Sequence, residues 1–353
     1  MIEKHFQLTG LDGQAFACTQ WLPDGPLSNA RATLQIAHGM GEHRLRYQGL
    51  AEALTGQGYA VYASDHRGHG DTRVAAGASD TRGSHVEAEG FYIEAEGSYV
   101  EAEGSGAMGK GGWRQTLSDM NYLAEFASTQ HPAKPPVLLG HSMGAALSQQ
   151  YIGLYGDTLS AAVLSGSPGF MGLAQLLFAQ IVARLEALRI GPDTPSDLLQ
   201  GLLFGKNNAA FTAAGSNSGA TPVSQDDLTG YEWLSKDRVE VEAYVADPKC
   251  GFVLTPRSLA EMFAGMRSAR SVDRVLAIPN ELPIYVFSGA DDPVHAEESG
   301  LNAMLSCYRS TGLQVDYKLY PAGRHEMLNE TNRVEVVADL ISWLDSTLND
   351  AEK

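Results

Sequence analysis

The 353-residue sequence predicts an α/β fold built on a mostly parallel, doubly wound sheet. Three observations support this prediction. Apolar, strand-like runs alternate with longer helix-like segments along much of the chain. Glycine-rich polar clusters directly follow several of these runs, as the active-site loops of open parallel sheets do. A serine also stands at the centre of the segment Gly140-His141-Ser142-Met143-Gly144, between an apolar run and a helix-prone run.

The elements follow one another in an order that fits this class. The first half of the chain predicts, in turn, short strands over 5–38 (the last over 32–37), a helix over 45–56, a strand over 59–63, a helix over 113–130, and the strand and helix around Ser142. The second half predicts a strand over 161–164 and, after a helical stretch, strands over 283–287 and 314–320. Parallel neighbours with helical crossovers explain this alternation.

Residues 168–280 interrupt the alternation and predict a mostly helical insertion, which we call the cap. The core is then expected in two parts, 1–167 and 281–353. Within the cap, residues 172–190 predict a helix with an apolar face. The residues of that face are Leu173, Leu176, Leu177, Ile181 and Leu185.

Residues 85–105 contain three copies of a seven-residue acidic repeat. Each copy carries the letters Glu-Ala-Glu-Gly after a β-branched residue, and three such short copies cannot build a solenoid. The repeat predicts either an acidic surface loop or a hairpin that affects access to a site or oligomerisation.

The bulk composition excludes some partners. A formal net charge of −17 argues against nucleic acid and against electrostatic attachment to anionic lipid. The three cysteines, Cys18, Cys250 and Cys307, are odd in number and widely spaced, which is typical of a reducing compartment without a disulfide framework. The N-terminal residues lack the apolar stretch of a signal peptide, and a cytoplasmic protein is expected.

Ser142 is the candidate nucleophile, and it needs a base and a carboxylate. A tight strand-to-helix turn exposes a serine hydroxyl, and in sheets of this type the aspartate and then the histidine follow it in the chain. His325 lies in a glycine-bearing loop after the last predicted strand, whereas His295 is expected at the surface. Asp292 is favoured over Asp291 as the carboxylate, because adjacent residues point in different directions.

Two backbone N–H groups are expected to bind the oxyanion of the reaction. Met143 opens the helix after Ser142, so its N–H points toward the reacting carbonyl. The Met40 N–H is the expected second donor, because glycines on both sides let the loop turn inward.

Other motifs are expected to have structural roles. The segment ending in Gly109-Lys110 lacks the serine or threonine that a phosphate-binding loop needs. Asp65 and Arg67 are expected to form an internal ion pair. No metal site is expected from the polar residues of the two loops that follow the strands over 32–37 and 59–63, because their spacing fits no known ligand set. These residues are His38, Glu42, His43, His66 and His69.

Taken together, the motifs resemble those of the monoacylglycerol lipase and lysophospholipase branch of the α/β-hydrolases. The motifs are His38-Gly39-Met40-Gly41-Glu42-His43, Asp65-His66-Arg67-Gly68-His69-Gly70, Gly140-His141-Ser142-Met143-Gly144 and Arg324-His325-Glu326. The similarity covers about residues 10–345, cap included, and the segments 233–237 and 247–252 are similar to the cap of bacterial members. The sequence departs from the family at Ala145, where many members have a second glycine, and at the 85–105 repeat.

The resemblance implies the triad Ser142, Asp292 and His325, the oxyanion donors Met40 and Met143, and a cap that forms an acyl pocket. The expected function is cofactor-free hydrolysis of medium- or long-chain carboxylic esters, monoacylglycerols foremost. A lysophospholipase, a general carboxylesterase or thioesterase, and a non-catalytic binding protein are the alternatives. Five cap residues could line the pocket or pack the cap on the core: Leu176, Leu177, Phe178, Ile181 and Leu202. An apolar cap face could also touch a lipid surface transiently.

Overall fold

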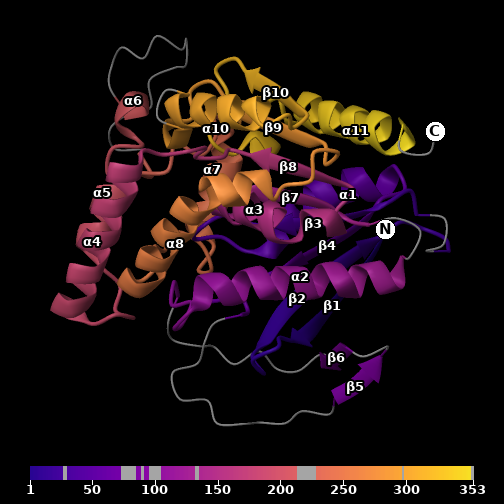
Figure 1. Cartoon of the computed structure of the whole chain (residues 1–353), viewed down its shortest axis with the longest axis horizontal. Helices are drawn as coiled ribbons and strands as arrows, with labels where there is room; N and C mark the ends of the chain where they lie inside the picture. Colours follow the sequence, from indigo (N-terminus) through magenta and orange to yellow (C-terminus); the bar gives the residue numbers. More distant parts are fainter. Residues whose placement is uncertain are drawn as a thin grey trace.

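The computed structural model describes residues 1–26, 30–72, 85–88, 91–94, 105–131, 135–212, 228–295 and 298–350. Its centre is a ten-stranded sheet in the order β10-β9-β8-β7-β3-β4-β2-β1-β6-β5 (Figure 1). The predicted α/β class with a mostly parallel sheet is confirmed. The part of the acidic repeat that is described contributes the hairpin β5–β6, which pairs with β1, and the rest of the repeat lies outside the described residues.

Six neighbouring strands are parallel and the others are antiparallel. The parallel strands are β3 (Thr33–Ala37), β4 (Ala60–Ser64), β7 (Val137–His141), β8 (Ala161–Ser165), β9 (Ile284–Gly289) and β10 (Val315–Tyr320). The antiparallel strands are β1 (Ile2–Thr9), β2 (Ala15–Leu22), β5 (His85–Ala88) and β6 (Phe91–Glu94). Every residue of β3, β4, β7, β8 and β9 is buried, as expected for strands covered on both faces.

Helices cover both faces of the sheet, and alternate residues of each central strand contribute to the two sides. Leu138, Leu164 and Val286 pack in one cluster with α2 (Gly112–Gln130), α3 (Met143–Tyr155) and α10 (Ser299–Ser310). Leu139, Val163 and Phe287 pack in the other cluster with α1 (Gln48–Gly56) and α11 (Arg333–Asp350). Successive side chains of a strand point to opposite faces, and both faces are covered by helices, so the central strands are mostly apolar.

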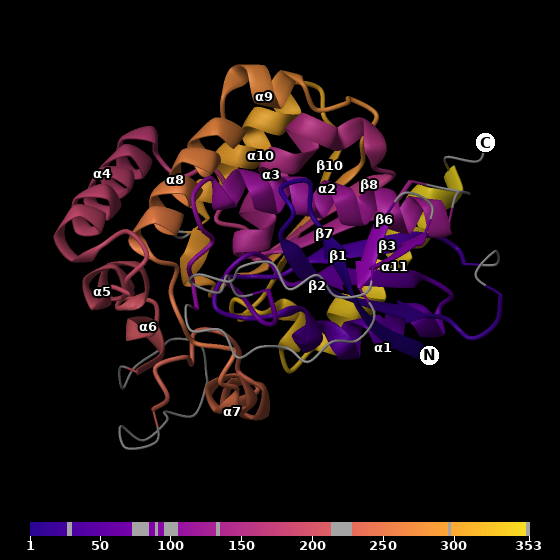
Figure 2. The ribbon, with the colours of Figure 1, turned by 90° about the horizontal axis from the view of Figure 1, so that it is seen from below.

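Between β8 and β9, the described residues form six helices. They are α4 (Leu173–Ile190), α5 (Asp197–Phe204), α6 (Ala209–Thr212), α7 (Arg238–Ala246), α8 (Pro256–Ala269) and α9 (Val272–Leu276). Helices α4, α5 and α6 project to one side of the molecule, far from α11 and the C-terminus (Figures 1 and 2). Helix α8 belongs to the same buried cluster as α3, so the limits 168–280 of the cap stay a prediction.

The apolar side of α4 corrects one expectation. Leu176 is buried, but Leu173, Leu177, Ile181 and Leu185 are exposed. The buried side of α4 instead includes Gln180 and Glu186, which find hydrogen-bond partners inside the cap. Hydrophobic periodicity located the helix correctly but not the direction in which its apolar side points.

No helix among the described residues is both long and apolar enough to cross a bilayer. The three cysteines are free thiols.

Candidate active site

Ser142 lies at the tip of the turn between β7 and α3. Its backbone has φ 53° and ψ −114°, a conformation that L-residues rarely adopt. The Ser142 N–H donates to the Ser165 carbonyl oxygen at 2.9 Å, which ties the turn to the end of β8. The surrounding structure therefore holds a strained serine at the carboxyl end of the central strands.

Two glycines make this turn sterically feasible. A Cβ at Gly144 would lie 2.0 Å from the Ala37 carbonyl oxygen, and a Cβ at Gly140 would lie 2.4 Å from the Gly144 carbonyl oxygen. Any side chain at either position would push α3 away from β3 and β7. Ala145 is fully buried in the core beside them, so the departure from the family at this position is accommodated.

His325 and Asp292 meet in the loops that follow β10 and β9. His325 Nδ1 lies 2.9 Å from Asp292 Oδ2, and both side chains are buried. Asp292 Oδ2 also accepts from the Ser288 hydroxyl at 3.0 Å, and its Oδ1 accepts from the Val294 N–H at 2.9 Å. The structure thus brings Asp292, rather than Asp291, to the predicted histidine.

This pair sets the charge of both groups. Burial alone would raise the pKa of Asp292, but the charge and hydrogen bond of His325 hold it below its ordinary value. Burial alone would lower the pKa of His325, but the Asp292 carboxylate raises it above 6.5. An ionised carboxylate can only accept, so Nδ1 carries the proton and Nε2 is left with a free lone pair.

Two aromatic groups flank the His325 ring. The His141 ring lies 4.8 Å from it between centroids, and the Trp233 ring lies 5.0 Å from it. The pKa of His141 is lowered to about 4, mainly because the ring is buried and secondly because His325 lies nearby. His141 is therefore neutral at pH 7. The backbone N–H of His325 donates to the Trp233 carbonyl oxygen, which ties the loop that carries His325 to the segment between α6 and α7.

The loop after β3 is held by a buried carboxylate. Glu42 Oε1 accepts from the Gly39 N–H and from the Tyr47 hydroxyl. Arg46 bridges Glu42 and Glu326, the residue after His325, at 2.7 Å from each. This Glu42–Arg46–Glu326 network was not predicted from the sequence, because Glu42 lies in the loop before the short 3-10 helix Arg44–Tyr47 and Glu326 is far along the chain.

A cavity of about 900 Å³ opens above these groups. Ser142, His325, Met40 and Met143 all line it. Met143 is the first residue of α3, so its N–H has no partner within the helix. Ser142 Oγ and His325 Nε2 form no hydrogen bond in this structure, although both residues face the same space.

Most of the cavity wall is apolar, and much of it comes from α4, α5 and α8. Of the five predicted pocket residues, Phe178 and Leu202 line the cavity. Leu176 instead packs in the core, which is the alternative that the sequence left open, and Leu177 and Ile181 are exposed outside the cavity lining. The wall residues that sequence reasoning missed are Phe170, Val182, Leu199, Met262, Phe263 and Met266.

Two further expectations are corrected. His295 is buried rather than at the surface: its Nε2 donates to the Gly289 carbonyl oxygen and its Nδ1 accepts from the Glu298 N–H, each at 2.9 Å. It therefore braces the loop that carries Asp292.

Asp65 and Arg67 do not pair with each other. Asp65 binds the Arg44 guanidinium, and Arg67 binds Asp12 and Asp119. Residues two apart in a loop point in different directions, and each charge found a partner from another part of the chain.

The five polar residues weighed for a metal in the sequence do not converge on one point. The rings of His38, His66 and His69 pack against one another at an angle in the interior, with the centroids of His38 and His66 4.1 Å apart. Burial is the largest cause that lowers the pKa of His66, to about 3. Glu42 faces Arg46, and His43 faces Asp247.

The sequence matches a family model and several known proteins. Residues 28–332 match the family model described as serine aminopeptidase, S33. The monoacylglycerol lipase of Mycolicibacterium smegmatis is 26% identical over 96% of both chains. The monoglyceride lipase of Rattus norvegicus is 30% identical over 96% of this chain and 89% of its own.

Solved structures show the same fold. A thermostable carboxyl esterase from Bacillus coagulans, solved with glycerol, superposes with a TM-score of 0.78 at 23% identity over 99% of both chains. The chain therefore belongs to the serine aminopeptidase S33 family of the α/β-hydrolases, in the branch that contains the monoacylglycerol lipases.

Proposed function

We propose that this enzyme hydrolyses monoacylglycerols through an acyl-enzyme on Ser142. One observation carries the proposal: Ser142 and His325 open into a single large cavity with a mainly apolar wall, and Asp292 binds His325 from behind. Relatives named monoacylglycerol lipase that align over 96% of the chain support the same substrate class. Medium- and long-chain acyl groups suit such a wall.

In the proposed reaction, Ser142 Oγ attacks the ester carbonyl carbon while His325 Nε2 takes its proton. The Met40 and Met143 N–H groups stabilise the tetrahedral oxyanion. The intermediate collapses, its bond to the glycerol oxygen breaks, and His325 returns the proton to that oxygen. Water then attacks the acyl-enzyme with His325 as base and releases the fatty acid. Asp292 keeps the proton on His325 Nδ1 and stabilises the charged ring.

A substrate panel tests the proposed function. Hydrolysis of a monoacylglycerol, a triacylglycerol, a lysophospholipid, an acyl thioester and p-nitrophenyl esters of increasing chain length would be compared. The proposal expects the highest kcat/KM for the monoacylglycerol. A preference for lysophospholipid, for thioester or for short soluble esters would replace it with the corresponding hydrolase function, and absence of any turnover would leave a binding protein.

Val182 offers a test of the acyl pocket, because it lines the cavity from α4 and is only partly buried. We expect Val182→Trp to lower kcat/KM for long-chain esters by about 10- to 100-fold, because the indole would occupy space needed by the acyl chain. Short-chain esters should be hydrolysed almost normally. Val182→Ala is the matched control and should keep long-chain activity; equal losses for short and long chains in Val182→Trp would contradict this assignment of the pocket.

The pH dependence of kcat/KM should report the free-enzyme pKa of His325. The base must be neutral, and its pKa is raised above 6.5 by Asp292, so activity should be lost as pH falls through a midpoint above 6.5. Rates would be measured with a neutral ester across the acidic range, with circular dichroism to show that the protein stays folded. A midpoint at or below 6.5 would be inconsistent with the His325–Asp292 assignment.

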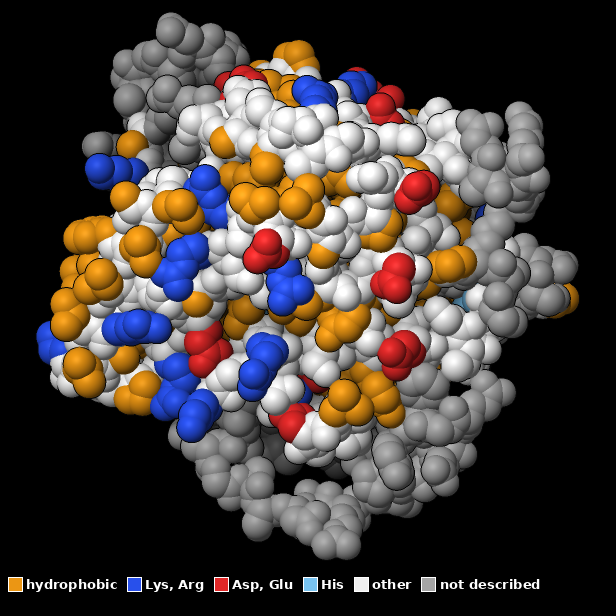
Figure 3. Space-filling model, viewed as in Figure 1, with side chains coloured by type: hydrophobic (Ala, Val, Ile, Leu, Met, Phe, Trp, Pro, Cys, Tyr) orange, Lys and Arg blue, Asp and Glu red, His pale blue; other side chains and the backbone are white. Residues whose placement is uncertain are grey.

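We also propose that the outer side of α4 and α5 touches lipid surfaces transiently. Exposed apolar side chains gather over α4 and α5, at the left edge of Figure 3. They are Leu173, Leu177, Ile181, Leu185 and Leu188 on α4 and Leu198 on α5, while the exposed Phe178 and Leu202 also line the cavity. Burial rather than net charge would drive such a contact, since the chain carries −17. The predicted location is therefore the cytoplasm, with transient contact at membrane surfaces.

A further inference from the structure

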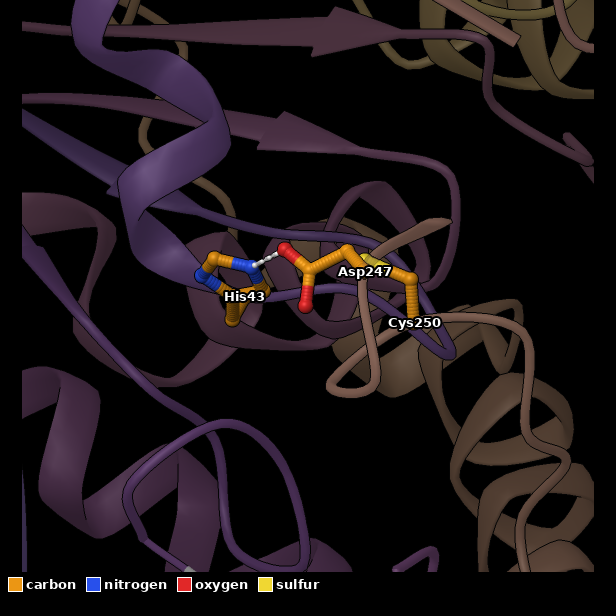
Figure 4. A group of neighbouring side chains, drawn as sticks. All are labelled: His43, Asp247 and Cys250. Atoms are coloured by element: carbon orange, nitrogen blue, oxygen red, sulfur yellow. Dashed lines mark hydrogen bonds and ion pairs between the residues drawn. The ribbon is translucent and has the colours of Figure 1, made fainter. Parts of the chain in front are cut away.

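His43, Asp247 and Cys250 meet at the junction between the core and the cap, outside the cavity lining (Figure 4). His43 follows the loop after β3, whereas Asp247 and Cys250 belong to the turn after α7. His43 Nε2 lies 2.8 Å from Asp247 Oδ2. One potential ligand atom from each of the three residues lies within 4.8 Å of the other two.

We propose that His43, Asp247 and Cys250 form a binding site for a thiophilic divalent cation such as Zn²⁺. Imidazole nitrogen, carboxylate oxygen and thiolate sulfur are the three donor types that bind Zn²⁺ in proteins, at about 2.0–2.3 Å. Donors at these distances from one ion lie some 3–4 Å apart, so side-chain rotations suffice to bring these atoms onto a common centre. Asp247 and Cys250 are both partly exposed, which leaves solvent to supply a fourth ligand.

The charges around the three side chains suit a cation of charge two. On binding, the Cys250 thiol loses its proton to solvent and its sulfur bonds the ion. The His43 ring proton, which lies on Nε2 in the hydrogen bond to Asp247, moves to Nδ1, so that Nε2 gives its lone pair to the ion. One thiolate and one carboxylate then balance the ion. The nearest cationic side chains are already paired: Lys249 with Asp71, and Arg46 with Glu42 and Glu326.

The site would join two segments that are about 200 residues apart in the sequence. The Gly251 N–H donates to the Gly41 carbonyl oxygen at 3.0 Å, Lys249 pairs with Asp71, and Asp247 bonds His43, so the turn already contacts the core at three points. A bound ion would replace the last of these with a stronger link beside the loop that carries Met40. Binding of the ion by these three side chains does not depend on which ester the enzyme cleaves.

Cobalt spectroscopy provides the most direct test. Metal-free, reduced full-length protein would be titrated with Co²⁺, whose tetrahedral thiolate complexes show d–d bands and a thiolate-to-metal charge-transfer band. We expect wild type to bind one ion with both features, and Zn²⁺ to displace it. Absence of the charge-transfer band in wild type would overturn the proposal without reference to any variant.

Variants then locate the site. Cys250→Ala and His43→Gln should each weaken Zn²⁺ binding, measured by competition with a chromophoric chelator, by at least about tenfold. Cys307→Ala is the matched control and should bind like wild type. The Tm of wild type and of Cys307→Ala should rise with added Zn²⁺, and the Tm of Cys250→Ala should not. Equal binding by wild type and Cys250→Ala would assign the ion to other ligands and reject this site.

Discussion

Replacing Ser142 by alanine is expected to lower kcat for ester hydrolysis by about 10⁵- to 10⁶-fold, while the protein stays folded. The hydroxyl is the proposed nucleophile, and without it only water in the active site can attack the ester. Alanine keeps the Cβ of the serine, so the backbone conformation of the turn should be retained. The rate would be measured at substrate concentrations well above KM.

Covalent labelling separates loss of the nucleophile from loss of structure. A fluorophosphonate should label wild type at Ser142 and leave Ser142→Ala unlabelled. Ser128→Ala, on the outer part of α2, serves as the control and should be labelled and active like wild type, because its hydroxyl only bonds the Ala124 carbonyl within the helix. Substantial turnover by Ser142→Ala would refute the proposed acyl-enzyme.

Replacing Asp292 by asparagine should lower kcat by about 10⁴-fold. The asparagine side chain fits the same space, but its NH₂ group can donate to His325 Nδ1 and so favour the ring tautomer with the proton on Nε2. That tautomer cannot accept the serine proton. The acidic limb of the pH profile should also move to lower pH, because the charge that raises the His325 pKa is gone.

Asp291→Asn is the matched control, because it makes the same chemical change one residue earlier. The Asp291 N–H bonds the Gly323 carbonyl, whereas the bond to His325 comes from Asp292. We expect Asp291→Asn to retain activity within a few-fold of wild type. If the two variants lost activity equally, the carboxylate would not act through its bond to His325.

The parts of the site that depend on local backbone chemistry could be predicted from the sequence. Gly140 and Gly144 around Ser142 specify a turn that only glycine permits, and the Cβ contacts at these two positions give the reason. The alternation of apolar runs and helix-like segments predicted the parallel sheet, in which the loops after the strands lie at one edge. The chain order of Ser142, Asp292 and His325 followed from that topology.

Other errors came from features that depend on packing between distant segments. The packing of α8 and α5 against α4 decides which side of α4 faces inward. For this reason the sequence did not show that Leu177 and Ile181 are exposed and lie outside the cavity lining. The burial of His295 likewise depends on the Gly289 carbonyl at the end of β9.

Contacts between polar side chains likewise depend on the tertiary structure. Asp65 pairs with Arg44 and Arg67 pairs with Asp119, because the energy of an ion pair depends on distance in space and on burial, not on separation in sequence. His43 contacts Asp247, which lies 204 positions later in the chain.

The sequence by itself determined the fold class, the serine turn and the order of the catalytic candidates, because short-range sterics and hydrophobic periodicity specify them. The tertiary structure alone decided the pocket wall, the ion pairs and the His43–Asp247–Cys250 cluster, because each requires two distant segments to be brought into contact.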